Sequence, residues 1–337
     1  MVAVGERGES LNPIAWSNDG ITWTGVTGTT IFNTKGYGVA WNGTIWVAVG
    51  YGGGGTHAIA WSNDGKTWTG VTGTTIFNTG HGVAWNGTLW VAVGYGTTHT
   101  IAWSNDGKSW TGLGKDIFTT AGYDVAWNGT WWVAVGEGSN SIAYSTNGIA
   151  WNELNNIFSP GRDIAWNGTL WVAVGNGYDA IAWSDDGITW TGVTETNIFY
   201  IGYGVAWNGT LWVAVGEGYT HAIAWSNDGK TWTGVTGWAI FTTGLGVAWN
   251  GTLWVAVGNG NNNSIAWSND GKTWTAITGH SIFSKGWDVA WNAGICDICM
   301  NSSITLNNYG PGLSNRLDVV ADKYYNQGYS NLTLTIN

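Results

Sequence analysis

The feature that most constrains this 337-residue chain is a unit that recurs at a period of about 40 residues, which is typical of propeller blades. Each unit predicts four short strands, with the sequences Gly-Val-Ala-Trp-Asn, Leu-Trp-Val-Ala-Val-Gly, Ala-Ile-Ala-Trp-Ser and Lys-Thr-Trp-Thr-Gly-Val. The run Val-Ala-Val-Gly begins at Val2, Val47, Val91, Val133, Val172, Val213 and Val255. The pair Trp-Asn begins at Trp41, Trp85, Trp127, Trp166, Trp207, Trp249 and Trp291.

The second strand of each unit is apolar on both faces. Trp46 and Ala48 point to one side of the strand and Val47 and Val49 to the other, and neither set is polar. A small sheet of this kind must be enclosed between two neighbours, as blades are around a propeller axis. We therefore expect an all-β, seven-bladed propeller of four-stranded blades. Residues 1–25 begin at a second strand, so residues 286–292 should complete that blade and close the ring.

Asn-Gly follows the first strand of six units. This dipeptide predicts a two-residue hairpin turn with both residues at positive φ. The Asn-Gly-Thr tripeptides also match N-glycosylation acceptors, but the turn geometry alone explains them. The copies are Asn42-Gly43, Asn86-Gly87, Asn128-Gly129, Asn167-Gly168, Asn208-Gly209 and Asn250-Gly251.

A second motif, Ser62-Asn63-Asp64-Gly65-Lys66-Thr67-Trp68, resembles the Asp box of sialidases, sortilin ectodomains and photosystem II assembly factors. The resemblance covers residues 1–292 and implies a propeller in which the aspartate holds the turn between the third and fourth strands. Because no alternating carboxylate ladder surrounds these residues, a structural role is preferred to calcium binding. The structural aspartates are Asp19, Asp64, Asp106, Asp186, Asp228 and Asp270, with a degenerate copy at Ser145. The repeats also loosely resemble uncharacterised proteins of large DNA viruses.

Composition excludes several classes of function. Only 9% of the residues are charged, the net charge is −10, and no basic stripe suited to a nucleic acid is visible. The sequence contains no run of about 20 apolar residues, so it does not predict membrane insertion. No signal peptide precedes Val2. The compartment stays open, with the extracellular space or a particle surface as the expectation for a binding module.

The repeat stops after residue 292, so the chain divides into a propeller, residues 1–292, and a C-terminal appendage, residues 293–337. The appendage contains Cys296 and Cys299. A zinc site would need two more ligands, so a local disulfide or free thiols are preferred. The appendage is interpreted as a small element packed on the ring, or alternatively as an anchor or oligomerisation element.

Sequence variation is concentrated in two sets of segments, which strand order places on one face of the ring. They are the loops between second and third strands and the links between blades, such as Gly36-Tyr37, Gly161-Arg162-Asp163 and Gly286-Trp287-Asp288. Aromatic and polar side chains on this face suit sugar stacking. The histidines are too far apart around a ring to chelate one ion. The candidate ligand-binding residues are Tyr51, His57, Tyr95, His99, Glu137, Tyr178, Asp179, Glu217, Tyr219, His221 and Trp238.

The sequence predicts a non-enzymatic recognition or display module that binds a glycan or a protein surface, with no cofactor, metal or catalytic residue. Near-identical blades favour repeated weak binding over a single catalytic constellation. One alternative is a structural or assembly protein that docks through the appendage or a disc face. Another is a glycoside hydrolase, which needs two carboxylates about 5–10 Å apart. Its candidates are Glu6, Asp124, Glu137, Asp163, Asp179, Glu217 and Asp288, whereas a sialidase would also need an arginine triad and the chain has only Arg7, Arg162 and Arg316.

Overall fold

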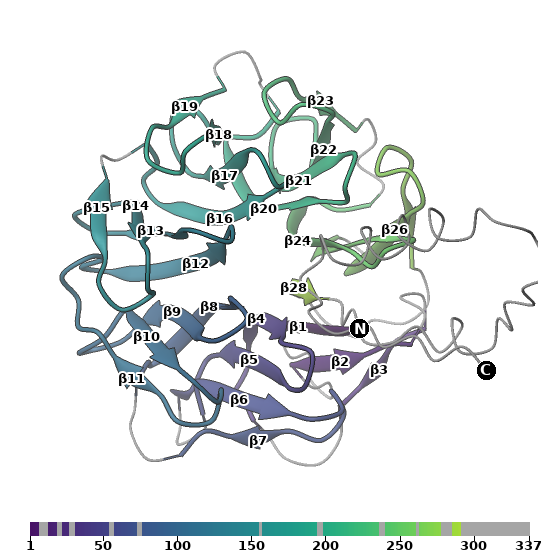
Figure 1. Ribbon diagram of the computed structural model, residues 1–337. Helices are drawn as coiled ribbons and strands as arrows, with labels where there is room; N and C mark the ends of the chain where they lie inside the picture. The colour runs from purple at the N-terminus through teal and green to yellow at the C-terminus, as the bar shows by residue number, and fades with distance from the viewer. Residues whose placement is uncertain are drawn as a thin grey trace, which may run out of the picture. The chain divides into compact units, whose positions relative to one another are not determined.

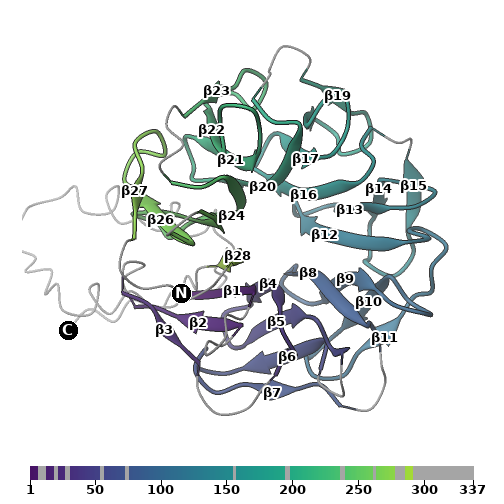
Figure 2. The ribbon, with the colours of Figure 1, turned by 180° about the vertical axis from the view of Figure 1, so that it is seen from behind.

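Seven antiparallel sheets of four strands form a ring of blades around a central axis (Figure 1), and the view from behind shows the same succession (Figure 2). The predicted seven-bladed β-propeller is confirmed. The described part of the chain contains no α-helix, and so none long enough to span a membrane. This computed structural model describes residues 1–6, 13–18, 22–26, 31–53, 57–72, 76–154, 157–193, 198–235, 240–260, 263–277 and 285–290. Asp19, Trp238 and the appendage with Cys296 and Cys299 lie outside these residues.

Within each blade the first strand lies at the axis and the fourth at the rim. The first strands are β28 (Lys285–Ala290), β4 (Gly36–Trp41), β8 (Thr79–Trp85), β12 (Ala121–Trp127), β16 (Gly161–Trp166), β20 (Ile201–Trp207) and β24 (Thr243–Trp249). The second strands are β1 (Val2–Glu6), β5 (Trp46–Gly50), β9 (Trp90–Tyr95), β13 (Trp132–Glu137), β17 (Trp171–Gly175), β21 (Trp212–Glu217) and β25 (Trp254–Asn259). The third strands are β2 (Ile14–Trp16), β6 (Ile59–Ser62), β10 (Ile101–Ser104), β14 (Ile142–Ser145), β18 (Ile181–Ser184), β22 (Ile223–Ser226) and β26 (Ile265–Ser268). The fourth strands are β3 (Thr24–Gly25), β7 (Thr69–Gly70), β11 (Thr111–Gly112), β15 (Asn152–Leu154), β19 (Thr191–Gly192), β23 (Thr233–Gly234) and β27 (Thr275–Ala276).

The two ends of the ring share one blade. Strand β28 pairs with β1, and the sheet order is β28-β1-β2-β3, so the predicted closure is confirmed. We call this sheet blade 1 and number the others in chain order, from blade 2 (β4–β7) to blade 7 (β24–β27). The first strands contact one another around the whole axis, including β24 with β28 and β28 with β4.

Each blade buries both faces against its neighbours. In blade 2, Trp46 packs with Val4 of blade 1. On the other face, Val47 and Val49 pack with Trp90 of blade 3. These contacts explain why the Trp-Val-Ala-Val part of the second strands carries no polar residue on either face, because neither face meets water there. The tryptophan that begins the second strand is fully buried in five blades, as Trp90, Trp132, Trp171, Trp212 and Trp254.

The Asn-Gly hairpins differ from the predicted two-residue turn. Trp41 pairs with Trp46, so four residues form the loop, and only Gly43 has a positive φ, +95°. Asn42 Oδ1 accepts the N–H groups of Thr44 at 2.9 Å and Ile45 at 2.8 Å. This side-chain cap lets the asparagine keep a negative φ, and it explains the wider loop.

The second motif forms a tight turn between third and fourth strands. Asp64 Oδ1 accepts the backbone N–H groups of the two residues after Gly65, at 2.8 and 2.7 Å. Ser62 Oγ accepts the Gly65 N–H at 2.8 Å, and Trp68 Nε1 donates to the Gly65 carbonyl oxygen at 3.0 Å. Gly65 has φ +72°, which favours glycine. Because Trp68 anchors this turn, the fourth strand starts later than predicted and contains only Thr69–Gly70.

The aspartate contacts recur at Asp106, Asp186, Asp228 and Asp270. In blade 4, Asn147 replaces the aspartate, and its amide oxygen accepts the equivalent N–H groups at 2.9 and 2.8 Å. Burial raises the pKa of the aspartates, but the hydrogen bonds outweigh it and hold the pKa of Asp270 at about 2.

Lysines of these turns cover tryptophans of the preceding blade. Lys230 Nζ of blade 6 lies 3.7 Å from the ring centroid of Trp183 in blade 5. Lys66 and Lys108 make the same contact with the blades before theirs, at 4.1 and 4.0 Å. Such a cation–π contact is worth about 0.5–1 kcal/mol at an exposed site.

Replacing Asp64 by alanine should lower the free energy of unfolding by about 1–2 kcal/mol, because two backbone N–H groups lose their acceptor. Asp64→Asn should cost less than half as much, since Asn147 shows that an amide oxygen makes the same contacts. Urea unfolding at neutral pH measures both, with Asn147→Asp as the reverse control. Equal losses for alanine and asparagine would contradict the proposed role of the acceptor.

Candidate functional site

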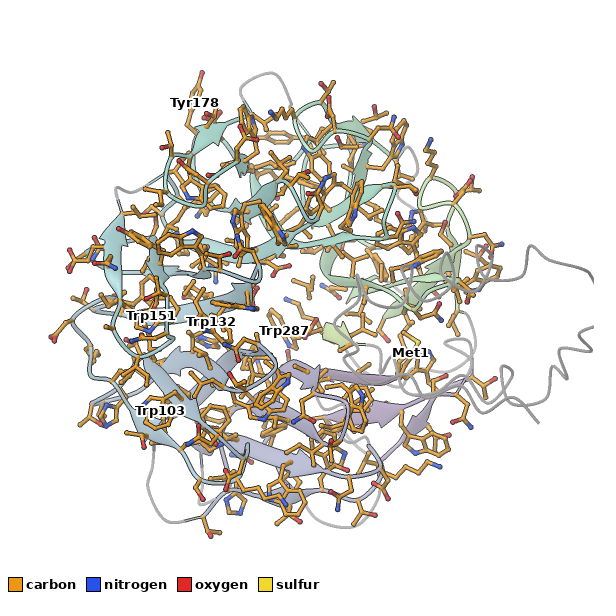
Figure 3. All side chains as sticks on the ribbon, in the orientation of Figure 1. Met1, Trp103, Trp132, Trp151, Tyr178 and Trp287 are labelled. Atoms are coloured by element: carbon orange, nitrogen blue, oxygen red, sulfur yellow. The ribbon has the colours of Figure 1, made fainter. Side chains whose placement is uncertain are left out.

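A β-bulge at the same phase of all seven first strands builds a site at the axis. In blade 2, Gly36 pairs with Gly50 and Gly38 with Val49, so Tyr37 has no partner residue on the second strand. Bulges redirect a side chain, and all seven bulged residues line one pocket at the axis. We call them the axial belt: Trp287, Tyr37, His81, Tyr123, Arg162, Tyr203 and Leu245, from blades 1 to 7. Figure 3 shows Trp287 in the central opening of the ring.

Ring contacts connect the belt from blade 1 to blade 4. The Tyr37 ring lies 5.2 Å from that of Trp287 and 5.3 Å from that of His81. His81 stacks on Tyr123, with centroids 4.9 Å apart and an interplanar angle of 16°. Together these rings give the pocket a wall that is largely flat and aromatic.

Arg162 continues the belt between two tyrosines. Its Cζ lies 4.5 Å from the ring centroid of Tyr123 and 5.7 Å from that of Tyr203. No carboxylate of the described residues forms an ion pair with it, and its buried Nε has no hydrogen-bond partner among them. Trp287 Nε1 is buried without a partner in the same way. Arg162 lines the pocket, so a guanidinium lies beside its aromatic wall.

The position after the belt residue is aspartate in three blades and glycine in four. At Gly246 blade 7 lies so close to blade 1 that a Cβ there would be only 2.7 Å from the Trp287 carbonyl oxygen, and glycine avoids this clash. In the other blades the carboxylate reaches the next blade: Asp163 accepts the Val205 N–H at 2.6 Å, and Asp288 accepts the Val39 N–H at 3.2 Å. The carboxylates thus connect blades as well as line the pocket.

Burial raises the pKa of all three carboxyl groups. It raises the pKa of Asp288 to about 7, with a further contribution from the charge of Asp163. Burial, the Asp163 charge and a hydrogen bond with Asp163 also raise the pKa of Asp124 well above its usual range. The pKa of Asp163 is raised by burial, although the hydrogen bonds it accepts oppose the rise.

His81 is neutral in the pocket. Burial lowers its pKa to about 4, although the hydrogen bond from Nδ1 to the Gly122 carbonyl oxygen, 2.9 Å long, favours the charged form. Because the carbonyl can only accept, Nδ1 carries the proton and Nε2 is an acceptor. The pocket has a free volume of about 100 Å³, and it holds donors, acceptors and apolar faces together. No group of three or more His, Cys, Asp or Glu side chains in the described ranges could hold a metal ion.

Two of the predicted glutamates lie near this belt. Glu137 accepts the Tyr123 hydroxyl at 2.7 Å, and so it holds one belt residue in place. Glu217 accepts the Tyr200 hydroxyl at 2.6 Å, and the Tyr219 ring lies 5.4 Å from that of Tyr200. Since Glu137 pairs with the start of β12 and Glu217 with the start of β20, the loops after the second strands lie near the end of the first strands that carries the belt residues.

The structure gives the predicted histidines backbone partners. Nδ1 of His57 and of His221 donates to the carbonyl oxygen of the residue after the fourth strand, at 2.9 and 3.0 Å. Nδ1 of His99 instead accepts the N–H of Gly114, two residues after the fourth strand, at 2.9 Å. Each ring covers the glycine of the fourth strand, and Asp179 covers Gly192 likewise. These four side chains lie on separate blades and do not form one site.

The predicted tyrosines are also spread around the ring. Tyr51 and Tyr95 are exposed at the ends of their blades, and Lys115 Nζ lies 5.9 Å from the Tyr95 ring. Tyr178 is 100% exposed and projects from the rim (Figure 3). Trp238 lies outside the described residues. Of the predicted set, the structure brings together Glu217 and Tyr219.

The axial belt was not among the predicted site residues. A signal for it exists in the sequence, since the belt position is the most variable one between the constant glycine and the constant Ala-Trp of each first strand, where the next residue is only glycine or aspartate. The links that contain these residues were recognised as variable. Without the bulge, however, strand alternation does not indicate that all seven side chains point to the axis.

The comparisons with known proteins show the fold alone. No protein-family model and no curated protein matches the chain. A solved nidogen/laminin complex contains a chain that is 11% identical, with a TM-score of 0.52 over 74% of this chain and 95% of that one. A putative 6-phosphogluconolactonase from Bacteroides uniformis is 13% identical, with a TM-score of 0.57 over 82% of this chain and 94% of that one.

The raised pKa of Asp288 predicts a pH-dependent stability difference. An unfolded aspartate loses its proton near pH 3.8 and folded Asp288 near 7, so the folded state binds more protons in this window. Its stability should therefore fall, relative to Asp288→Asn, as the pH rises from about 4 to 7, by roughly 1 to 4 kcal/mol.

Urea unfolding of both proteins at several pH values measures this difference. His81 acts in the opposite sense but is common to both proteins, so it cancels in the comparison. Asp64→Asn is the matched control, because the pKa of Asp64 is lowered and its titration lies below the window. A constant difference between wild type and Asp288→Asn would contradict the prediction.

Proposed function

We propose that this protein is a non-enzymatic recognition module that binds a carbohydrate at the axial pocket. The observation that carries the proposal is the axial belt, which places aromatic rings, a guanidinium and carboxyl groups around one pocket. A propeller fold is consistent with a binding module. One structure with a similar fold was solved as part of a nidogen/laminin complex.

The chemistry of the pocket matches a polyhydroxylated ligand. A sugar hydroxyl both donates and accepts hydrogen bonds, so it can accept one from the guanidinium of Arg162 and donate one to a carboxylate of Asp163 or Asp288, all of which line the pocket. The apolar faces of a sugar ring suit the rings of Tyr37 and Tyr203, which line the same pocket. The pocket is also narrow, and it seats one small polar unit.

A second candidate is glycoside hydrolysis, for which the pocket holds three carboxyl groups, those of Asp124, Asp163 and Asp288. Burial raises the pKa of Asp124 well above its usual range, as a general acid needs, but its contact with Asp163 is closer than the about 5–10 Å between the two carboxyl groups of a glycosidase. Both carboxylates also accept the N–H of Ile164, and Asp163 binds the next blade through Val205. This engagement with the backbone favours a structural role, and we rank hydrolysis second. Release of reducing sugar that is lost in Asp163→Asn would support it.

A glycan-array screen of the full chain tests the proposal, with a heat-unfolded sample as control. Specific binding is expected, and Arg162→Gln should weaken it at least about tenfold, or ~1.4 kcal/mol. Lys230→Gln is the matched control, because it removes a cation stacked on an aromatic ring away from the pocket. Its binding should equal that of wild type.

Two results would contradict the proposal. A blank array with a well-folded protein would favour docking on a protein surface or a particle. Equal weakening by Arg162→Gln and Lys230→Gln would show that binding lies outside the axial pocket. Thermal unfolding of both variants separates loss of binding from loss of fold.

A further inference from the structure

Blade 6 carries tyrosines both in the pocket and on the adjoining surface. Tyr203 lines the axial pocket, and its hydroxyl has no hydrogen-bond partner among the described residues. Tyr200 lies three residues earlier, immediately before β20, and Tyr219 lies in the loop after β21. An extended strand rises about 3.3 Å per residue, so Tyr200 and Tyr203 are roughly 10 Å apart along the chain. This separation is comparable to the length of a disaccharide.

The outer two tyrosines are held in place although they are exposed. Tyr200 is 41% and Tyr219 79% exposed, and their rings lie 5.4 Å apart at an angle of 52°. The hydrogen bond of 2.6 Å from the Tyr200 hydroxyl to Glu217 fixes the first ring. Ordering these side chains before binding lowers the entropic cost of holding a ligand.

The arrangement is particular to blade 6. Tyr178 of blade 5 occupies the loop position that Tyr219 has in blade 6. The residue of blade 5 that corresponds to Tyr200 is Ser159. Tyr178 is accordingly fully exposed, without a ring contact to another aromatic side chain of the described residues. Blade 5 therefore has an exposed tyrosine without the ordered pair.

We infer that the ligand is an oligosaccharide whose terminal unit enters the axial pocket and whose following units lie on Tyr200 and Tyr219. This inference rests on the proposed function and adds a direction and a minimum length to it. Tyr203 marks the inner end of the path at the pocket wall, and Glu217 both orients Tyr200 and offers a carboxylate to a sugar hydroxyl. The pocket holds about 100 Å³, so the rest of a chain must leave it across the face.

Calorimetric titration of the full chain with oligosaccharides of one to four units tests this inference. The probes are the chito-, cello- and manno-oligosaccharide series. Affinity should rise at least tenfold from one unit to three or four in the series that binds. Tyr219→Ala should abolish this rise and leave the affinity for the single unit unchanged. Glu217→Ala should reduce the rise, and Glu217→Gln, which keeps an acceptor for Tyr200, should largely restore it.

Tyr178→Ala is the matched control, since it removes an equivalent but unpaired tyrosine, and it should change nothing. If affinity does not depend on length, or if Tyr178→Ala and Tyr219→Ala act alike, the inference is overturned and the pocket alone binds the sugar. If no probe binds and the glycan array is also blank, the proposed function fails and the inference with it. A melting temperature for each variant shows whether the fold is intact.

Discussion

The structure depends on the burial of each blade between two others. A four-stranded sheet whose second strand carries Trp46 on one face and Val47 on the other cannot leave either face in water. A row of such sheets buries its ends only if the row closes. Strand β28, from the far end of the repeat, provides this closure by pairing with β1. Packing between blades, more than hydrogen bonding within them, therefore sets the architecture.

At the axis, the residues of the first strands that take no part in strand pairing can vary, and a site can form there. Near the axis the first strands approach so closely that glycines such as Gly246 touch the carbonyl of the next blade. Where aspartate replaces glycine, its carboxylate bonds across the same boundary. The bulged residue beside it has no partner on the second strand, so it can vary without disturbing a ladder. Tyrosine, histidine, arginine, leucine and tryptophan all occur there, which makes the belt the part of the ring that can acquire specificity.

The sequence predicted the architecture better than the site. Seven blades, the shared blade and the apolar faces follow from periodicity and alternation, which are properties of regular strands. Predictions were less accurate where side chains hydrogen-bond to the backbone. Asn42 caps two N–H groups, which widens the hairpin loop, and Trp68 belongs to the turn, so the fourth strand begins after it. The belt was missed because a bulge such as the one at Tyr37 is not readable from alternation. The engagement of His57 with the backbone depends on loop geometry that spacing alone does not determine.

Each recurring type of polar contact between blades keeps one direction around the ring. Lys230 reaches back to the preceding blade, and Asp163 reaches forward to the following one. Every blade thus presents one kind of face to the blade before it and another to the blade after it, as in a head-to-tail cyclic assembly. A duplicated blade would find matching surfaces on both sides wherever it was inserted. The identity of residues 59–73 and 223–237, in blades 2 and 6, is what such interchangeable parts would leave behind.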